Sequence, residues 1–531
     1  MIFSSSRRSS LPRPGSPLYL LVLCLLVFFL YGPSLMVGFF SSGFDDDVFV
    51  TANRRLSLSW ENLYFLFTHF FNGDYLPLTY LSLSLDHAIW GLNPLGYHLT
   101  NIMLHFINAS LLYFCFIAIT QRRALSLFAA ALWAAHPVNV EAVVLVAQRK
   151  TLLAGCFFLL AFLRYRKFST SNLRTDYFQS LFFFILSLAA KSTGVILPFL
   201  LLLYEYRFHR PRLSIYNKIP FLLLGLAGAA LTVASKWSDW GAKGLYGGDL
   251  FTTSMIMAQV YIEYLVSLAL PYSLLPYYAY GSPTLLQGAL PTLGLAFLIG
   301  FTIYFRKKFP NFFFFIAWFF IALIPVSNLV PGATIRADRF LYIPSMIFAL
   351  WLAQAVLNGL EGKKRLHPNM WKIVPALIIL SYGYISASYV RDWLNPLILW
   401  ERSLRRYPNH PVVLHEIGAI WHKLGDKNRA LDYYWKTIQS HVCYGVTYNN
   451  AGVIYYERKS YAEAQDLFRK AIECEPKIIQ AYVNLGLTYV TLRKEKEALA
   501  YIEKATALDP ELRKNAKLIA LMDRLRRDLG E

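Results

Sequence analysis

Long apolar runs, separated by short loops rich in arginine and lysine, dominate the first 390 residues of this chain. A run of about 20 apolar residues is the length that an α-helix needs to cross the hydrocarbon core of a bilayer. A chain inside a bilayer can satisfy its backbone hydrogen bonds only as a helix or a closed barrel, so these runs predict transmembrane helices. The composition agrees, because 56% of the residues are hydrophobic and only 16% are charged. These values are typical of a polytopic membrane protein rather than a soluble one.

The apolar runs predict about eleven spans. The first, from Leu18 to about Phe40, follows Arg7, Arg8 and Arg13 and ends without a small-residue cleavage site, so we expect an uncleaved signal anchor with its N-terminus in the cytoplasm. Segment 252–271 is not counted among the eleven, because it is the weakest candidate and we expect it to be re-entrant or interfacial. The other ten spans are predicted near residues 97–118, 124–140, 150–164, 177–190, 192–206, 218–236, 284–304, 311–329, 340–358 and 371–389.

Basic clusters between the spans indicate the orientation, because lysine and arginine near span ends tend to stay in the cytoplasm. The formal net charge of +20 is explained by such loops facing anionic lipid, and no motif points to nucleic acid. We therefore expect an inner-membrane protein whose loop 41–95 and C-terminal part face the periplasm. The clusters predicted to be cytoplasmic are residues 121–123, 164–174, 207–212, 306–308 and 363–365.

Three consecutive aspartates, Asp45, Asp46 and Asp47, follow the first span directly. Adjacent carboxylates repel one another, so a site that is even partly enclosed needs a cation, a hydroxyl to deprotonate, or water around them. Such acids at the membrane surface are candidates for catalysis. The alternative interpretation is a solvated loop.

Several cations are predicted near the outer ends of spans, against the usual bias of basic residues. Ionisable groups in such places are more often functional than incidental, and several of them together suit one anion. A lipid-linked phosphate is the natural ligand, because arginine offers a fixed fork to phosphate oxygens and lysine adds a mobile charge. In the alternative, each cation reaches to headgroups or pairs with an acid such as Glu141 or Asp338. The candidates are Arg149, Lys150, Lys191, Arg336 and Arg339.

Residues 391–531 form a second part that is polar and helically periodic. Its sequence repeats every 34 residues, the period of tetratricopeptide repeats, in which pairs of antiparallel helices stack into a solenoid. Small residues at Gly418, Gly452 and Gly486 would let the two helices of a pair approach closely. Such a solenoid is a binding surface rather than a catalyst. The repeats are predicted at 409–442, 443–476 and 477–510, with a polar capping helix at 511–531.

Several blocks of the chain together resemble one family. They include Phe44-Asp-Asp-Asp-Val-Phe-Val-Thr-Ala-Asn53, Pro77-Leu-Thr79, Gly91 to Asn101 with His105, His136-Pro-Val-Asn-Val-Glu141, Gln148-Arg-Lys150, Ala190-Lys-Ser-Thr-Gly194 and Ala337-Asp-Arg-Phe-Leu-Tyr-Ile-Pro344. In this order they are similar to bacterial multispanning proteins with tetratricopeptide repeats. Those proteins resemble the animal transmembrane and tetratricopeptide-repeat-containing O-mannosyltransferases of the GT-C glycosyltransferase superfamily.

The resemblance implies an all-α fold, a GT-C-like membrane helix bundle of residues 1–390 followed by the repeat solenoid. It implies transfer of a sugar, with mannose the best-known case, from a polyprenyl-phosphate carrier to an acceptor hydroxyl on the outer face. The acceptor would be serine or threonine of a protein. As a further hypothesis, based on position alone, the repeats present this acceptor. The family's acidic pair aligns with Asp45 and Asp46 as catalytic residues, supported by Asp47 and Glu141. The five outer cations would bind the lipid phosphate, and His98, His136, Asp338 and Tyr342 would contact substrate.

Some features depart from the family or leave alternatives open. Tyr75-Leu76 stands where the relatives have Trp-His, and Thr151 where an aspartate is common, so no role is carried over to those positions. The mechanism requires no cofactor, although a divalent cation on the aspartates is an alternative because hard cations prefer carboxylate oxygens. Cys443 and Cys474 could pair in an oxidising compartment. The rival functions are an oligosaccharide ligase or polymerase with a lipid diphosphate donor, and a non-catalytic scaffold for envelope assembly.

Overall fold

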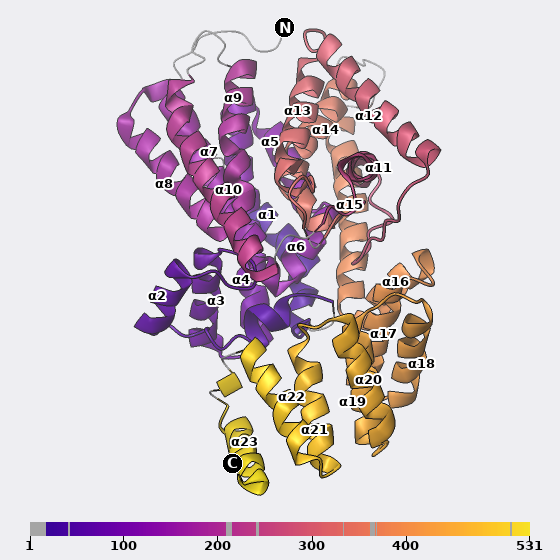
Figure 1. Cartoon of the computed structure of the whole chain (residues 1–531). Coiled ribbons are helices and arrows are strands. Elements are labelled where there is room, and N and C mark those ends of the chain that lie inside the picture. The colour runs from indigo at the N-terminus through magenta and orange to yellow at the C-terminus, as the bar shows by residue number, and fades with distance from the viewer. Residues whose placement is uncertain are drawn as a thin grey trace. The chain divides into compact units, whose positions relative to one another are not determined.

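The structure is a computed structural model of the whole chain, and Figure 1 shows its helices. It describes residues 17–40, 43–208, 215–240, 244–332, 334–361, 367, 369–509, 512–513 and 515–530. The chain divides into two compact units, Met1–Asn395 and Pro396–Glu531. Every regular element in the described residues is helical, which confirms the all-α prediction. The boundary that the sequence suggested, near Arg391, falls inside the last helix of the first unit.

The first unit is a bundle of apolar helices. Six of its described helices are long and apolar enough to cross a membrane, and the number rises to seven if the bent pair α5–α6 is one span. The predicted count of eleven is not confirmed, because helices such as α9, with 12 residues, are too short for that test. The helices are α1 (Pro17–Tyr31), α2 (Trp60–Thr68), α3 (Pro77–Trp90), α4 (Pro94–Thr120), α5 (Arg123–Ala134), α6 (Val140–Val144), α7 (Arg149–Ser171), α8 (Arg174–Ala190), α9 (Leu197–Phe208), α10 (Ile219–Trp240), α11 (Leu250–Ala269), α12 (Leu285–Tyr304), α13 (Pro310–Leu323), α14 (Pro344–Leu360) and α15 (Met370–Trp393).

Contacts between distant loops bring basic clusters together at one end of this bundle, called here the basic end. Arg122, after α4, pairs with Glu361, after α14. The guanidinium of Arg207, at the end of α9, donates a hydrogen bond of 2.8 Å to Asn311, at the start of α13 and just beyond residues 306–308. These contacts agree with the prediction that the clusters share one side. Arg166 of the cluster 164–174 donates a 2.6 Å hydrogen bond to the carbonyl of Ala118, near the end of α4. Residues 1–16, 209–214 and 362–366, which carry other predicted basic residues, lie outside the described part of the chain.

The opposite end of the bundle, called here the site end, collects the loops between α1 and α4, between α6 and α7, and between α8 and α9. The hydroxyl of Thr79 in α3 donates a hydrogen bond of 2.9 Å to the carbonyl of Ala190 at the end of α8. The bend between α5 and α6 turns the chain towards this end. Pro137 lacks an N–H and cannot continue α5, and His136 caps the new turn by accepting a 3.3 Å bond from the N–H of Val138.

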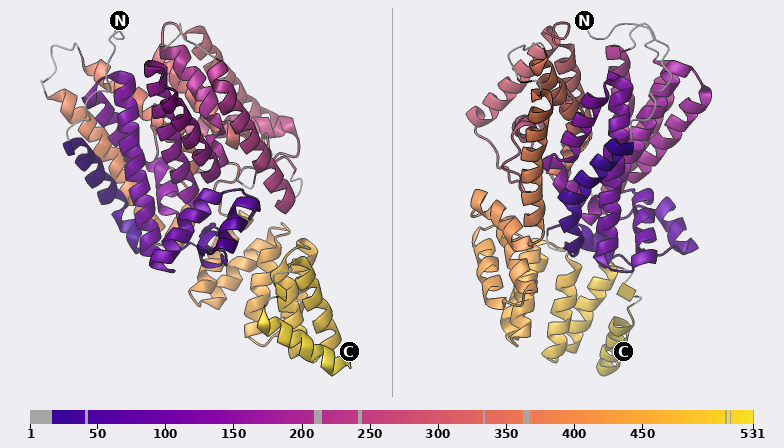
Figure 2. Two further views of the ribbon diagram at one scale, coloured as in Figure 1. Left: turned by 90° about the vertical axis from the view of Figure 1, so that its left-hand side faces the viewer. Right: turned by 180° about the vertical axis from the view of Figure 1, so that it is seen from behind.

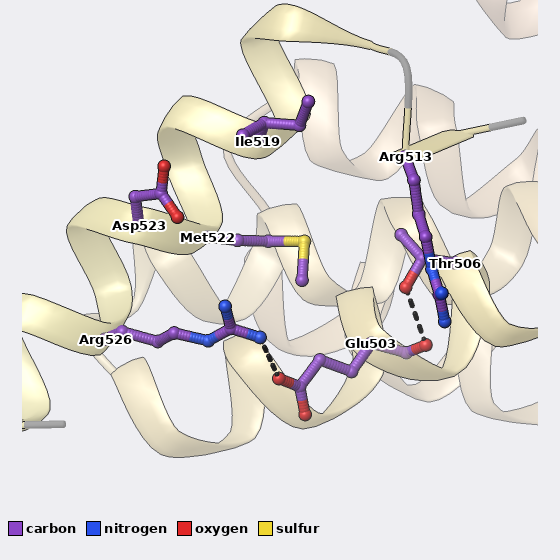
Figure 3. Close-up of a pocket in the computed structure, with 7 residues that line it drawn as sticks. All are labelled: Glu503, Thr506, Arg513, Ile519, Met522, Asp523 and Arg526. Atoms are coloured by element: carbon purple, nitrogen blue, oxygen red, sulfur yellow. Dashed lines mark hydrogen bonds and ion pairs between the residues drawn. The ribbon is translucent and has the colours of Figure 1, made fainter. Parts of the chain in front are cut away.

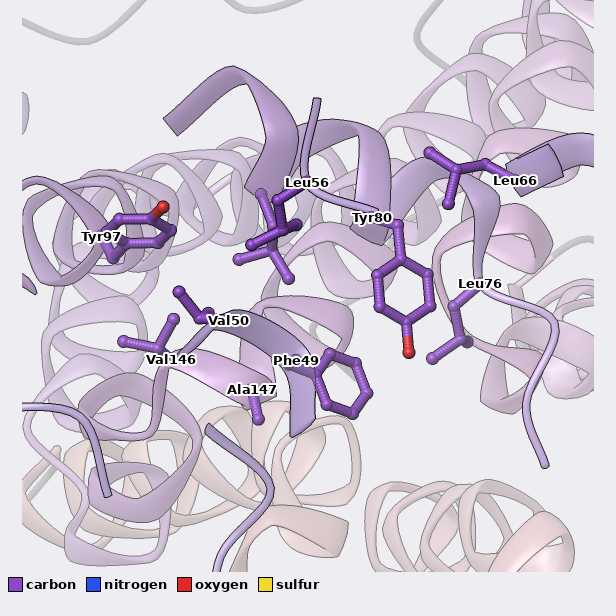
Figure 4. Packing of buried hydrophobic residues seen from close by; sticks show 10 residues of the cluster. Phe49, Val50, Leu56, Leu66, Leu76, Tyr80, Tyr97, Val146 and Ala147 are labelled. Atoms are coloured by element: carbon purple, nitrogen blue, oxygen red, sulfur yellow. The ribbon is translucent and has the colours of Figure 1, made fainter. Parts of the chain in front are cut away.

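A small hydrophobic core holds the site end together (Figure 4). Phe49 stacks on Tyr80 of α3 with 5.2 Å between the ring centres. Val146 and Ala147, just before α7, join the same core. Burying side chains of this size stabilises the fold by about 1.5–3 kcal/mol each, an upper bound for a chain already partly collapsed. The loop that carries the aspartates is therefore fixed to the membrane helices rather than left in solvent.

The second unit is a solenoid of helix pairs (Figure 2). The first helices of three successive pairs begin at Pro411, Gly445 and Ile479, which are 34 residues apart. A Cβ on Gly452 would lie 2.7 Å from the ring of Phe468, so glycine allows the close approach of the pair. A disulfide joins Cys443 to Cys474. The helices are α16 (Pro396–Arg406), α17 (Pro411–Lys423), α18 (Lys427–Gln439), α19 (Gly445–Glu457), α20 (Tyr461–Cys474), α21 (Ile479–Thr491), α22 (Glu495–Leu508) and α23 (Ala516–Leu529).

Candidate active site

The fold separates the aspartates of the triplet. Asp46 is fully buried, and its two carboxylate oxygens accept hydrogen bonds from the N–H of Ala147 at 2.7 Å and of Phe40 at 3.2 Å. Burial raises the pKa of Asp46 to about 7, although the backbone N–H groups favour the ionised carboxylate. Asp47 is half-buried and accepts a 2.8 Å bond from the N–H of Val48. Asp46 therefore ties the end of the first span to the start of α7.

Asp45 presents its carboxylate to solvent and to a lysine. Its side chain is 57% exposed and lies 3.9 Å from the ammonium of Lys150. The same ammonium lies 3.7 Å from the carboxylate of Asp74 and 4.5 Å from the centre of the Phe49 ring. Lys150 is thus held between two partly exposed acids over an aromatic face. Asp45 is the member of the triplet that a substrate hydroxyl could reach.

Asp74 was not predicted from the sequence. It follows a tight turn in which Asn72 and Gly73 both have positive φ, at 53° and 70°. The turn folds residues 71–74 back so that Phe71 and Asp74 exchange backbone hydrogen bonds of 3.0 and 3.1 Å. The Asn-Gly-Asp signal for a turn was present in the sequence. Nothing in the sequence, however, indicated that this turn would bring the carboxylate to Lys150.

Two further cations lie beside Lys150. Lys191, half-buried between α8 and α9, donates a hydrogen bond of 2.9 Å to the hydroxyl of Thr151. Its ammonium and the guanidinium of Arg339 lie 5.9 Å and 5.3 Å from the centre of the Phe340 ring. Burial, together with the positive charges of Lys150 and Arg339, lowers the pKa of Lys191 to about 7. The structure thus brings three of the five predicted phosphate-binding residues, Lys150, Lys191 and Arg339, into one electrostatic neighbourhood.

Glu141 anchors Arg339. One oxygen of the carboxylate accepts a 2.9 Å bond from the N–H of Arg339, and the other accepts from its guanidinium. The side chain of Glu141 is 2% exposed and that of Arg339 is 17% exposed. Glu141, predicted as a supporting acid, therefore holds the guanidinium of Arg339, which remains partly exposed to solvent.

Arg336 and Asp338 belong to a more enclosed network. The guanidinium of Arg336 donates to Glu263 and, at 3.0 Å, to Ser267, and it covers the Tyr278 ring at 3.9 Å. Asp338 is fully buried and accepts a 2.7 Å bond from the hydroxyl of Tyr278. Burial and the nearby charge of Glu141 raise the pKa of Asp338 to about 7. With its side chain 6% exposed, Arg336 braces this segment against α11 instead of facing an open site.

Arg149 does not join the cation group. Its side chain is fully buried, and its ion pair with Asp86 is 2.7 Å long. It also donates to the side chains of Asn101 at 2.6 Å and Ser82 at 2.9 Å, and to the carbonyl of Tyr97 at 2.8 Å. Four of the five guanidinium N–H groups therefore have partners within the protein. In this structure Arg149 joins α3, α4 and α7, and the expectation that it binds phosphate stays a prediction.

The predicted substrate contacts on aromatic side chains are also enclosed. His136 is fully buried, and its ring lies 2.9 Å from the carbonyl of Leu268. The hydroxyl of Tyr342 lies 3.0 Å from the ring of His105 and accepts a 2.9 Å bond from Asn108. His98 is fully buried beside the backbone of Gly38 and Val144. These three side chains support the bundle, and none of them is open to a substrate here.

The alternative of a divalent cation on the triplet has little geometric support. Both oxygens of Asp46 are occupied by backbone N–H groups, whereas the carboxylate of Asp45 faces Lys150. Among the described residues, no group of three or more histidine, cysteine, aspartate or glutamate side chains could hold a metal ion.

The second unit also contains a recess. It measures about 350 Å³ and lies between α22 and α23 (Figure 3). Arg526 and Glu503 form a 2.8 Å ion pair across it. Its other lining residues are Thr506, Arg513, Ile519, Met522 and Asp523. It lacks the grouped cations found at the site end.

Comparison with known proteins identifies the repeats of the second unit and relatives of the whole chain. Residues 446–474 and 479–512 match models of the tetratricopeptide repeat, so the chain joins an apolar membrane helix bundle to tetratricopeptide repeats. It is similar over most of its length to protein O-mannosyl-transferase TMTC3 of Mus musculus, with 24% identity over 79% of this chain and 51% of that protein. Protein O-mannosyl-transferase TMTC1 of Mus musculus is 34% identical over 25% of this chain and 15% of its own length. The chain thus spans about half the length of the TMTC3 relative.

Among solved structures, the oligosaccharyltransferase of Archaeoglobus fulgidus, crystallised with a tethered acceptor peptide, aligns over 73% of this chain and 56% of that chain. The identity is 16% and the TM-score is 0.39. A TM-score this low does not establish a common fold. The resemblance to the O-mannosyltransferases therefore depends on sequence.

Proposed function

We propose that this chain is an integral-membrane glycosyltransferase that moves a sugar from a polyprenyl-phosphate carrier to an acceptor hydroxyl. The observation that carries the proposal is a carboxylate open to solvent, Asp45, beside the three grouped cations Lys150, Lys191 and Arg339. A hydroxyl nucleophile needs a base, and a departing phosphate needs positive charge. The sequence similarity to named protein O-mannosyl-transferases supports mannose as the sugar and a protein as the acceptor, and we propose serine or threonine as the residue that receives it.

In the proposed reaction, the acceptor hydroxyl attacks the anomeric carbon of the lipid-linked sugar. The bond from that carbon to the phosphate oxygen breaks, and the phosphate leaves on its carrier. Asp45 takes the proton of the hydroxyl as the new bond forms, a role worth about 10²- to 10⁴-fold in rate. Lys150 and Arg339 would stabilise the charge on the leaving phosphate, with Lys191 as a third donor.

Asp46 has a different part in this proposal. Its oxygens are occupied by the backbone N–H groups of Phe40 and Ala147, so it positions the loop rather than contacting the acceptor. Asp74 shares Lys150 with Asp45 and would keep the ammonium in place when Asp45 takes up a proton. Asp45 and Lys150 are therefore the pair on which activity should depend most.

We further propose that the site end and the repeats face the outer side of the membrane, and that the repeats present the acceptor protein. The gathering of basic clusters at the other end of the bundle supports this orientation, since such clusters stay in the cytoplasm. The disulfide between Cys443 and Cys474 also supports it, because disulfides persist in oxidising compartments.

The test is a transfer assay on purified protein in lipid nanodiscs, with radiolabelled polyprenyl-phosphate sugars as donors and envelope extract as acceptor. We expect label to move to protein with the native chain, and at a rate lower by about 10²-fold or more with Asp45→Asn. Asp432→Asn is the matched control, because Asp432 is an exposed aspartate of the second unit paired with Lys436. Undiminished transfer by Asp45→Asn would defeat the assignment of the base.

Two other outcomes would replace the proposal. Transfer only from lipid-diphosphate donors would identify a ligase or polymerase. No transfer from any donor, together with specific capture of envelope proteins by the repeats, would favour the scaffold.

A further inference from the structure

Three aromatic rings meet where the last membrane helix ends. The ring centre of Trp393, the final residue of α15, lies 5.3 Å from that of Phe40 and 5.1 Å from that of Phe44. The rings of Phe40 and Phe44 are themselves 5.6 Å apart. Trp393 is fully buried, and Tyr389, one turn earlier in α15, lies 6.0 Å away. The three residues Phe40, Phe44 and Trp393 are called here the aromatic clamp.

The aromatic clamp holds the segment that carries the aspartates. The N–H of Phe40 donates one of the two hydrogen bonds that fix the carboxylate of Asp46. Phe44 directly precedes Asp45 in the chain. Trp393 therefore contacts Phe40, which holds the carboxylate of Asp46, and Phe44, which precedes Asp45. About 350 residues of sequence separate Trp393 from these two phenylalanines.

The aromatic clamp also lies near the C-terminal end of the first unit. Trp393 is two residues before Asn395, the last residue of the first unit, and α16 of the second unit begins at Pro396.

We propose that Trp393 is a positioning residue that couples the end of α15 to the segment that carries Asp45 and Asp46. Packed aromatic rings in a protein interior are stiff, and they transmit small displacements because no void is present to absorb them. Moving or removing the indole would let Phe40 and Phe44 shift and would weaken the bond from Phe40 to Asp46. The catalytic consequence rests on the proposed function of Asp45, whereas the structural consequence does not.

The competing explanation is that Trp393 is an ordinary core side chain. In that case its loss would weaken the whole bundle evenly. The proposal requires instead a local loosening of the loops around Asp46, and this difference can be measured.

The experiment compares three variants of the full chain in nanodiscs: Trp393→Ala, Trp393→Phe and Trp371→Ala. Trp371 lies near the other end of the same helix, is 49% exposed, and serves as the matched control. Hydrogen–deuterium exchange is read on peptides from 37–50 and 144–150, because the N–H groups of Phe40 and Ala147 donate to Asp46. Transfer is measured in parallel as kcat and as KM for the donor.

For Trp393→Ala we expect exchange in both peptides to be faster by up to about tenfold, the effect of losing roughly one hydrogen bond. We expect kcat to fall by about 10²-fold, since a misplaced catalytic group costs that much, with the donor KM unchanged. Trp393→Phe should be intermediate, because a phenyl ring keeps one aromatic edge. Trp371→Ala should change neither the exchange in the two peptides nor kcat.

Exchange that is unchanged in both peptides, or that rises equally in peptides from the basic end, would overturn the proposal. If Trp393→Ala does not fold, Trp393→Phe decides the same question. Faster local exchange without measurable transfer by any variant, the native chain included, would uphold the coupling and reject the proposed function.

Discussion

Neighbouring residues of the triplet have opposite environments. Asp45 is open to solvent beside Lys150, whereas Asp46 is buried and held by two backbone N–H groups. Asp46 is the N-cap residue and Asp47 the first residue of the short helical element Asp47–Thr51, and successive side chains around a helix point in different directions, so a sequence of like residues does not make a cluster of like function. Asp45 is suited to exchange a proton with a substrate, and Asp46 is suited to hold a loop.

The stability of the site end should depend on pH through Asp46. Burial raises its pKa to about 7, from an unfolded value near 3.8. Between these two values the native state binds more protons than the unfolded state, so stability should fall as pH rises from about 4 to about 7. Asp46→Asn should flatten that slope while leaving one N–H without an acceptor. Thermal unfolding in nanodiscs between pH 4 and pH 8 would show this; an unchanged slope in the variant would contradict the assignment.

Lys191 should make donor binding depend on pH. Burial and two neighbouring cations lower its pKa to about 7, so it loses its charge as pH rises above that value. A bound phosphate favours the charged form, and we therefore expect the donor KM to increase from pH 7 to pH 9. Lys191→Gln should have a higher KM at pH 6.5 and little further increase. A variant that keeps the full pH dependence would locate the titrating group elsewhere.

Arg149 should act on stability and not on the donor. It is fully buried with Asp86 at 2.7 Å. Breaking a buried pair by removing one partner costs about 3–5 kcal/mol, whereas replacing both partners by apolar residues costs much less. Arg149→Met should therefore unfold at a clearly lower temperature, and Arg149→Met with Asp86→Leu should recover part of the loss. A donor KM that rises in the folded Arg149→Met protein would instead support a role for Arg149 in phosphate binding.

Among the elements, the sequence predicted the repeats better than the site. A 34-residue period with glycine at fixed offsets specifies helix pairs locally, and α17, α19 and α21 begin at that spacing. The position of Asp74 beside Lys150, and the burial of Arg149 and His136, depend on how α2 to α8 pack against one another. Residue type and spacing carry no information on that packing. Hence the chemistry of the site could be anticipated, but not which charged residues face solvent.

The disulfide between Cys443 and Cys474 links the two ends of the second repeat covalently. Cys443 lies just before α19 and Cys474 ends α20, at a sequence separation of 31. Closing a loop of this size restricts the unfolded chain and stabilises the fold by roughly 3 kcal/mol. We expect Cys443→Ser with Cys474→Ser to lower the urea midpoint of the second unit within the full chain. The native chain should show the same lowered urea midpoint when a reductant is added. If the native chain has equal urea midpoints with and without reductant, the disulfide between Cys443 and Cys474 does not form.

For the whole molecule, the two ends of the helix bundle differ in charge and in chemistry. The basic end joins loops near Arg122 and Arg207, and the site end holds Asp45, Lys150 and Asp74. Because basic loops tend to remain in the cytoplasm, this asymmetry supports the proposed orientation, in which the site end faces away from the cytoplasm. In that orientation an acceptor protein would meet the site from outside the cytoplasm.

Orientation can be tested by labelling single cysteines in intact cells with a maleimide that does not cross membranes. Leu58, at the site end, is 41% exposed, and Arg306 lies in the exposed connection between α12 and α13 at the basic end. The free cysteines Cys24, Cys115 and Cys156 are first replaced by alanine. We expect Leu58→Cys to react in intact cells and Arg306→Cys only after permeabilisation. The reverse result would place Asp45 in the cytoplasm, where Cys443 and Cys474 would also be kept reduced. The two measurements must therefore agree, and disagreement between them would mean that the first unit and the repeats do not share the sidedness proposed here.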